Sequence, residues 1–179
     1  MGEADWVVVV ARLPSEPSRH RVAVWRELRR AGALPLGGGS WTAPAGPLID
    51  EVLAQVHELV GRADGELIVM DATARNNDSS ALLRDRYTAG REAEWTEFLN
   101  DCDKYTAELA HEVAIEKFTL AELDEEEQSL DRLRRWHRTL SLRDRFGAPS
   151  APEAQQRLDT CTARLHDYSE LVYQALEQT

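Results

Sequence analysis

The sequence has few of the features that mark secreted, membrane-spanning or disulfide-rich proteins. Its two cysteines, Cys102 and Cys161, are too few and too far apart to suggest a disulfide framework. No apolar run approaches the roughly 20 residues that a membrane span needs, so we predict no membrane association. The opening residues, MGEADW, lack the basic and then apolar order of a signal peptide. We therefore expect a cytoplasmic protein.

Basic residues are also scarce. The 179-residue chain has 21 Lys and Arg against 32 Asp and Glu, which gives a formal net charge of −11. This excess of negative charge argues against broad, non-specific binding to nucleic acid or to anionic lipid. The exception is the segment 12–30, which holds six arginines and two glutamates. We therefore expect one local basic patch on an otherwise acidic protein.

The first 75 residues alternate between strand and helix patterns. β-Branched and aromatic residues over 6–13 predict a strand, and helical spacing follows from Ser18 until Gly32. Two short strands flank the glycines 37–39, a second amphipathic helix begins at Pro47, and a last strand covers 66–72. This βαββαβ order is typical of the ferredoxin-like fold, with four antiparallel strands and two helices on one face. We assign residues 1–75 to such a domain within an α+β protein.

Residues 76–179 lose the strand pattern and predict a helical domain of three mainly antiparallel helices. The polar segment 75–80 marks the boundary, with Asp78 or Ser79 as the expected helix cap, and Gly90 weakens the first helix. One apolar stripe is expected on each helix. The stripes are Leu83, Tyr87, Phe98, Cys102, Tyr105 and Leu109, then Leu120, Leu123, Leu130, Leu133 and Leu140, and finally Leu158, Cys161, Leu165, Tyr168 and Val172.

Several short motifs are typical of one family. They are Leu13-Pro14, Trp25-Arg26-Glu27-Leu28, Gly32 and Trp41-Thr42-Ala43-Pro44 in the first half, and Glu116-Lys117-Phe118-Thr119, Trp136 and Phe146-Gly147 in the second. With these motifs the chain resembles, over essentially its whole length, the N-terminal region of the chromate-resistance regulator ChrB. The first 75 residues are also similar to the Cas2-like domain of PaaX-type phenylacetate repressors.

The ChrB resemblance implies a non-enzymatic regulatory module in transcriptional control of resistance to chromate, an oxyanion, acting through DNA or a partner protein. ChrB proteins continue into a C-terminal domain, whereas this chain ends at Thr179, so a protein partner is expected to supply that domain. We predict no cofactor and favour no enzymatic activity. A Cas2-like nuclease needs an acidic residue at the end of its first strand to hold a divalent cation, and this chain has Arg12-Leu13 there.

The first candidate site is a basic face on the helix predicted from Ser18. At about 100° per residue, Arg19, Arg26 and Arg30 project close together, with Arg29 beside them and Arg12 near. Guanidinium groups suit phosphate or chromate, so we expect weak, salt-sensitive binding to the DNA backbone. The alternative, which is commoner for charge clusters, is a solvated or internally paired face. The opposite side of the helix is expected to face the core with Val24, Trp25, Leu28 and Ala31.

The second candidate site consists of polar residues that fall within the apolar stripes of the helical half. They are Arg91, Glu112, Glu116, Glu126, His137 and Asp144. If these groups face one another between helices, they form a binding site for a metal or a small ligand, or the active site of an enzyme. The sequence does not indicate which metal would bind. The alternative is a buried network of groups that neutralise each other, because unpaired burial of charge is costly.

Self-association is also expected. A four-stranded sheet with both helices on one face leaves its other face open, and apolar strand residues there favour a covering partner. A homodimer provides that cover. The competing arrangement places the chain's own helical half over the same face, which leaves a monomer.

Overall fold

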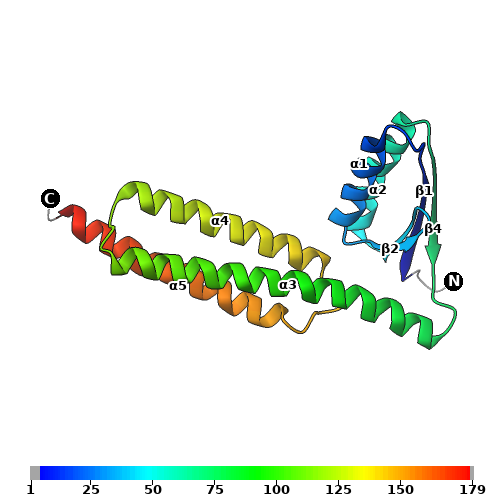
Figure 1. Ribbon diagram of the computed structural model, residues 1–179. Helices are drawn as coiled ribbons and strands as arrows, with labels where there is room; N and C mark the ends of the chain where they lie inside the picture. The colour runs from blue at the N-terminus through cyan, green and yellow to red at the C-terminus, as the bar shows by residue number, and fades with distance from the viewer. Residues whose placement is uncertain (1–4, 178–179) are drawn as a thin grey trace. The chain divides into compact units, whose positions relative to one another are not determined.

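The computed structural model of the protein describes residues 5–177. The chain divides into two compact units, Met1–Ala89 and Gly90–Thr179. The first contains a four-stranded antiparallel sheet, two helices and the start of the long helix Asn77–Ala114, and the second is helical (Figure 1). The predicted α+β class is therefore confirmed. Within the described range, no helix has the length and apolar character needed to cross a membrane.

The sheet of the first unit has the strand order β2-β3-β1-β4, with every neighbouring pair antiparallel. Its helices α1 and α2 lie on one face of the sheet (Figure 1). Along the chain the elements are β1 (Trp6–Arg12), α1 (Ser18–Arg30), β2 (Leu34–Gly37), β3 (Ser40–Pro44), α2 (Pro47–Arg62) and β4 (Glu66–Ala72). The central strand β1 is thus held by hydrogen bonds on both sides.

The core of the first unit forms where alternate residues of β1 meet the two helices. Val7 and Val9 point to this side, and both are buried. The apolar positions of α1 and α2 recur at helical spacing and cover them, and each fully buried aliphatic side chain contributes about 1.5–3 kcal/mol. The helical members of this core include Val24, Leu28, Ile49, Val52, Val56 and Val60.

The other face of the sheet stays partly uncovered within this unit. Ile68 and Met70 of β4 are 49% and 47% exposed, and their β1 partners Val10 and Val8 are half-buried. Trp6 is buried on this side, because Tyr87 packs against it with ring centroids 6.1 Å apart. Thr42 of β3, the partner of Val8, is buried there too. An apolar strip on the open face is therefore accessible between β1 and β4.

One expected core residue of α1 lies outside the core. Val24, Leu28 and Ala31 are buried as predicted, but Trp25 is 50% exposed. The physical reason is that Trp25 follows Val24 with a rotation of roughly 100° about the helix axis. This places its side chain at the flank of the apolar stripe and not over the sheet. Its indole therefore lies at the surface of the first unit.

The second unit is built from three helices, α3 (Asn77–Ala114, of which the part from Gly90 belongs to this unit), α4 (Leu120–Arg143) and α5 (Ala151–Glu177). Side-chain contacts define their directions. Trp95 and Tyr105 of α3 bond to Asp144 and to the Glu126 carbonyl, so α4 runs antiparallel to α3. Further contacts join Cys102 to Cys161 and Lys117 to Tyr168, so α5 runs parallel to α3 and antiparallel to α4.

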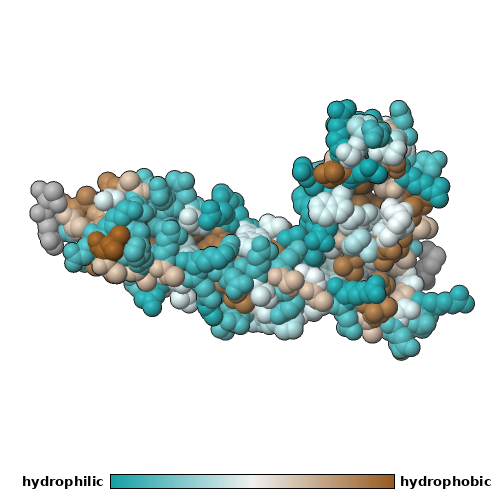
Figure 2. All heavy atoms as spheres, in the orientation of Figure 1, coloured by the Kyte–Doolittle hydropathy of each residue, from teal (hydrophilic) through white to brown (hydrophobic). Residues whose placement is uncertain are grey.

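The predicted stripes form the core of this unit with few exceptions. Tyr105, Leu130 and the whole α5 stripe are buried, whereas Leu120, at the first position of α4, is 51% exposed. In the view of Figure 2, the outside of these helices is mainly hydrophilic, with hydrophobic residues in separate places. Each helix therefore turns one apolar stripe inward, as expected for a small bundle.

Helix ends differ from the prediction at two positions. The cap of α3 is Asn76, whose Oδ1 accepts from the Ser79 backbone N–H at 2.8 Å, rather than Asp78 or Ser79. Glu116 lies beyond the end of α3, in a turn with φ of 54°. The helix α3 runs without a break through Gly90. The boundary between the two compact units therefore lies within this helix, whereas the change from sheet to helix along the chain falls near residue 76.

Candidate functional site

The basic face of α1 combines exposed arginines with no acidic partner. Arg19, Arg26 and Arg29 are exposed, and within residues 5–177 none of them forms an ion pair. Arg29 instead lies over the ring of Trp25, with its guanidinium carbon 5.6 Å from the ring centroid. These three guanidinium groups are therefore available to an anion from solution.

The two remaining arginines of the predicted patch are partly neutralised. The Arg30 Nε bonds to Glu27 at 2.9 Å, and its Nη1 lies 3.7 Å from Glu51 of α2. Arg12, at the end of β1, faces Glu66 at 3.8 Å, and both side chains are largely exposed. Exposed pairs of this kind are weak and easily exchanged for another anion, yet they reduce the charge that the face presents.

The six polar residues predicted as a second site do not converge. Arg91 and Glu112 are 21 positions apart on α3, which places them about 30 Å apart along the helix axis at about 1.5 Å per residue. Glu116 is exposed in the turn after α3. The residues that remain form two separate groups, one near each end of the bundle.

The first group ties the start of the bundle together. Buried Arg91 forms an ion pair with Glu94 at 2.9 Å, and Glu94 also faces Arg143 of α4 at 3.4 Å. Asp144 accepts from the indole N–H of Trp95 at 2.9 Å and from the backbone N–H of Ala148. The two acidic side chains of this group are therefore already engaged with neighbours.

His137 belongs to the same end of the bundle but makes aromatic contacts. Its ring centroid lies 5.1 Å from that of Trp95 and 5.5 Å from that of Phe98. Burial among these rings lowers the pKa of His137, because the charged imidazolium loses hydration. At neutral pH the residue is therefore uncharged, and it packs half-buried against two aromatic rings of the core.

The second group contains two buried carboxylates at the other end. Glu112 faces Lys117 at 3.5 Å, and Lys117 in turn pairs with Glu122 at 2.6 Å. Glu126 is 4% exposed, and burial, with the nearby charges of Glu108 and other glutamates, raises its pKa to about 7. One oxygen of Glu126 has no hydrogen-bond partner among the described residues. This carboxyl group is therefore held close to half-protonation at neutral pH.

Neither group offers a metal centre. Among the described residues, no three His, Cys, Asp or Glu side chains are placed so that they could hold a metal ion. The acidic residues of the second group also have a lysine among them, which competes with a cation for the carboxylates. In both groups buried charges contact oppositely charged or polar neighbours.

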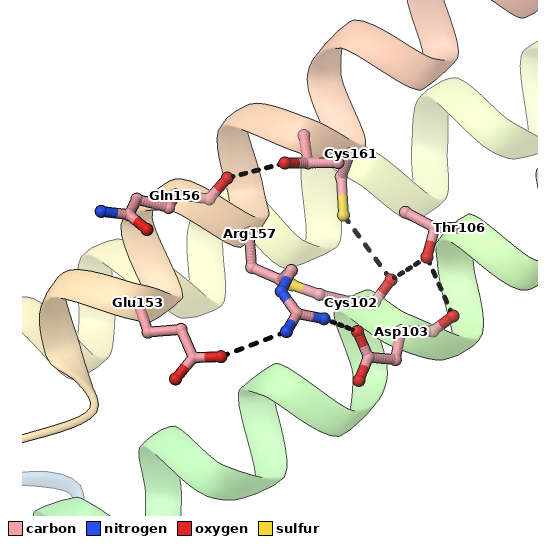
Figure 3. A network of polar contacts seen from close by, with 8 residues as sticks. Cys102, Asp103, Thr106, Glu153, Gln156, Arg157 and Cys161 are labelled. Carbon is pink, nitrogen blue, oxygen red and sulfur yellow. Dashed lines mark hydrogen bonds and ion pairs between the residues drawn. The ribbon is translucent and has the colours of Figure 1, made fainter.

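A third polar network, between α3 and α5, was not predicted (Figure 3). The Cys161 thiol donates to the Cys102 carbonyl at 3.7 Å, while Arg157 bridges Asp103 and, at 3.1 Å, Glu153. A hydrogen bond with the Cys161 side chain, together with burial, raises the pKa of the Cys102 thiol. Both cysteines are free and buried, as their places in the apolar stripes predicted.

Sequence reasoning also missed Arg21. In helical projection this residue falls about 200° from Arg19, on the same side as buried Leu28. It is nevertheless exposed, and it lines a cavity together with Trp25. The signal that identifies it is an arginine on the apolar side of a helix, where an aliphatic residue is the usual choice.

Comparison with protein families gives one match. The model that describes the N-terminal region of protein ChrB matches residues 21–179, which is most of the chain. The chain belongs to the ChrB N-terminal family. The resemblance to ChrB drawn from the sequence motifs is confirmed. The matched range of this ChrB-family protein includes Arg21, Arg26, Arg29 and Arg30 of α1 and begins after Arg12 and Arg19. The curated proteins gave no match.

Proposed function

We propose that this ChrB-family chain is a non-enzymatic regulatory module of chromate resistance that acts in the cytoplasm through DNA or a partner protein. The family match carries the proposal for the regulatory role. The first unit supports a ferredoxin-like assignment, since its elements follow the order β1-α1-β2-β3-α2-β4 and its strands lie in the order β2-β3-β1-β4. Such a domain presents α1 on its surface.

The basic face of α1 is the proposed contact with the DNA backbone. Arg19, Arg26 and Arg29 are the guanidinium groups free to neutralise phosphates, whereas Arg30 is engaged with Glu27 and Glu51. Three phosphate contacts give a log–log slope of affinity against salt near −3 for one copy, or about −5 for a dimer with six contacts. Contacts of this kind position a protein on DNA without reading its sequence.

Fluorescence anisotropy with a labelled duplex at several salt concentrations tests this contact. The triple variant Arg19/Arg26/Arg29→Ala is expected to lose most of the affinity and the salt slope. The matched control, Arg132/Arg135/Arg138→Ala, removes three exposed arginines from α4 and gives the same change of net charge. Equal losses in the two variants, or tight binding unchanged in the first, contradict the proposed contact.

The open face of the sheet is the proposed surface for a homodimer. The apolar strip of Val8, Val10, Ile68 and Met70 lies on the central strand β1 and the edge strand β4, and burying it against a second copy removes apolar area from water. A partner protein through which the module acts would compete for the same surface. Both arrangements predict that the strip is covered when the protein acts.

Sedimentation at micromolar concentration tests the dimer. We expect a species of twice 20.2 kDa, converted to a monomer by Met70→Lys, because a charge in the strip is costly to bury. The control Leu142→Lys places the same charge on a side chain that is already 73% exposed on α4. A 20.2 kDa species for the unaltered chain contradicts the dimer.

A further inference from the structure

A cavity of about 430 Å³ lies in the first unit, beside the basic face of α1. The end of β1, the middle of α1 and the β2–β3 hairpin line it, and it is open to solvent. The volume falls within the range of about 300–1,000 Å³ that small-molecule sites occupy. One water molecule occupies about 30 Å³ in the liquid, and the volume of a tetrahedral inorganic oxyanion is only a few times larger. Such an ion would therefore leave most of the cavity empty.

Glycine brings the hairpin close enough to form one wall of this cavity. The Ala11 backbone N–H donates to the Gly39 carbonyl at 2.9 Å, and Gly39 has φ of 81°. A Cβ at position 39 would lie 2.5 Å from the Ala11 carbonyl oxygen, which is closer than real side chains approach. Only glycine therefore lets the hairpin pack against the end of β1 in this way.

The polar lining of the cavity is cationic. Arg12 and Arg21 both contribute to it, and none of the described lining residues is acidic. Arg21 forms no ion pair within residues 5–177, and the contact of Arg12 with Glu66 is long and exposed. Because two guanidinium groups face the same space with little internal neutralisation, the cavity favours an anionic group.

The apolar lining of the cavity includes two tryptophans beside aliphatic residues. Trp41, at 8% exposure, belongs to the core, while Trp25 is half-exposed at the side of the cavity. Arg29 lies over the Trp25 ring but does not line the cavity. The indole therefore contacts a cation and also borders the open space of the cavity. An indole held in this way offers a stacking surface to a flat ring.

We infer that this cavity binds a small organic anion that carries a flat aromatic ring. The ring stacks on Trp25, and the phosphate or carboxylate lies against Arg21 and Arg12. The three residues belong to α1 and to the adjoining end of β1, so the site is complete within one unit of the chain. The inference does not depend on DNA binding, because Arg21 is outside the proposed backbone contact.

Isothermal titration calorimetry with the full chain tests the site. The two probes are AMP, which pairs a ring with phosphate, and 2-naphthoate, which pairs a ring with carboxylate, and their relative affinities distinguish the two sources of anion. At least one probe is expected to bind with a Kd of about 1 mM or tighter. Adenosine and inorganic phosphate, each carrying half of the AMP chemistry, are expected to bind at least about tenfold more weakly than AMP if AMP is the ligand that binds.

Two variants and one control locate the site. Trp25→Ala and Arg21→Gln are each expected to weaken binding about tenfold or more, the size of the loss of one stacked ring or one charge-assisted contact. Both side chains are exposed, so the fold tolerates the changes. The control Arg62→Gln removes an exposed arginine of the same unit, on α2 and outside the cavity, and is expected to stay within about twofold.

Several results overturn the site. These are no binding of either probe, binding of inorganic phosphate as tight as that of AMP, or probe binding that Trp25→Ala and Arg21→Gln leave unchanged. Since Arg19→Ala, Arg26→Ala and Arg29→Ala address DNA in a separate assay, failure of the DNA contact and failure of the ligand site give different results. A chain that binds AMP but no duplex keeps the cavity and loses the backbone contact.

Discussion

The first unit (the sheet unit) and the second unit (the helical unit) place their charged side chains in opposite environments. In the sheet unit the arginines of α1 face water, and Thr42, bonded to the Val7 carbonyl at 3.0 Å, is the one buried polar side chain described. In the helical unit Arg91, Glu112 and Glu126 are buried among apolar residues. The same kinds of residue therefore remain available in one unit and are used for packing in the other.

This difference indicates where to look for binding. Buried charges with partners add little net stability over apolar side chains, but removing one partner is strongly destabilising, so they fix the packing of helices. Variants of such groups lose the fold before they reveal a ligand. Exposed guanidinium groups beside a cavity have the opposite property, because their removal costs little stability and directly removes a contact.

The largest expected effect comes from the core of the helical unit. Phe98 is fully buried and contacts the rings of Trp95 and Trp136 with centroids 5.8 Å and 5.4 Å away. Phe98→Ala leaves a cavity and is expected to lower the free energy of unfolding by about 3–5 kcal/mol. Urea unfolding followed by circular dichroism measures this change, and Leu142→Ala, at an exposed position of α4, serves as the control.

Anisotropy and calorimetry on Phe98→Ala then break or support the comparison of the two units. If binding depends on the sheet unit alone, the folded variant keeps the duplex and AMP affinities of the unaltered chain. A large loss of both affinities at a temperature where the variant remains folded would mean that the helical unit contributes to binding. The contrast between available and packed charges would then be wrong.

An intermediate effect is expected from Glu126. Its pKa is raised from 4.5 to about 7 in the folded protein, so the folded state holds its proton more tightly than the unfolded state. Stability is therefore lost as pH rises from about 4.5 to 7 and stays reduced above that range. Glu126→Gln removes this penalty and is expected to stabilise the protein by about 2–3 kcal/mol at pH 8, relative to its effect at pH 4.

Thermal unfolding of both proteins across this pH range measures the Glu126 effect. The matched control is Glu125→Gln, an exposed neighbour on the same helix. A stability difference between Glu126→Gln and the unaltered chain that does not change with pH would show that the carboxyl group titrates normally. The buried charges of the helical unit would then cost less than its packing suggests.

The sequence was sufficient for the features that depend on periodicity. Alternation in β1, helical spacing in α1 and α2, and the three-and-four spacing of Leu158, Cys161 and Leu165 each fix which side of an element is buried. These patterns are local, so one chain is enough to recognise them. The short motifs additionally identified the ChrB N-terminal family, which periodicity alone does not reveal.

The candidate sites could not be predicted in the same way, because they depend on distances between residues, which periodicity does not give. Projection down an axis placed Arg91 and Glu112 on one stripe but ignored the rise of about 1.5 Å per residue, so residues about 30 Å apart were grouped. The same projection assigned Trp25 to the core and gave no role to Arg21, because the cavity beside them is formed by the distant hairpin. Contacts between segments far apart in sequence decide both cases.

The smallest expected effect concerns the ion pairs of α1. Arg30 bonds to Glu27 at 2.9 Å and faces Glu51 at 3.7 Å, yet its side chain is 41% exposed. Water and salt screen such pairs, and ordering the long side chain offsets part of the attraction, so Arg30→Gln is expected to change the free energy of unfolding by less than about 1 kcal/mol. Urea unfolding at low and high salt measures it. A loss above about 2 kcal/mol would show that charges of the sheet unit are needed for packing, as in the helical unit, and the two units would then differ only in degree.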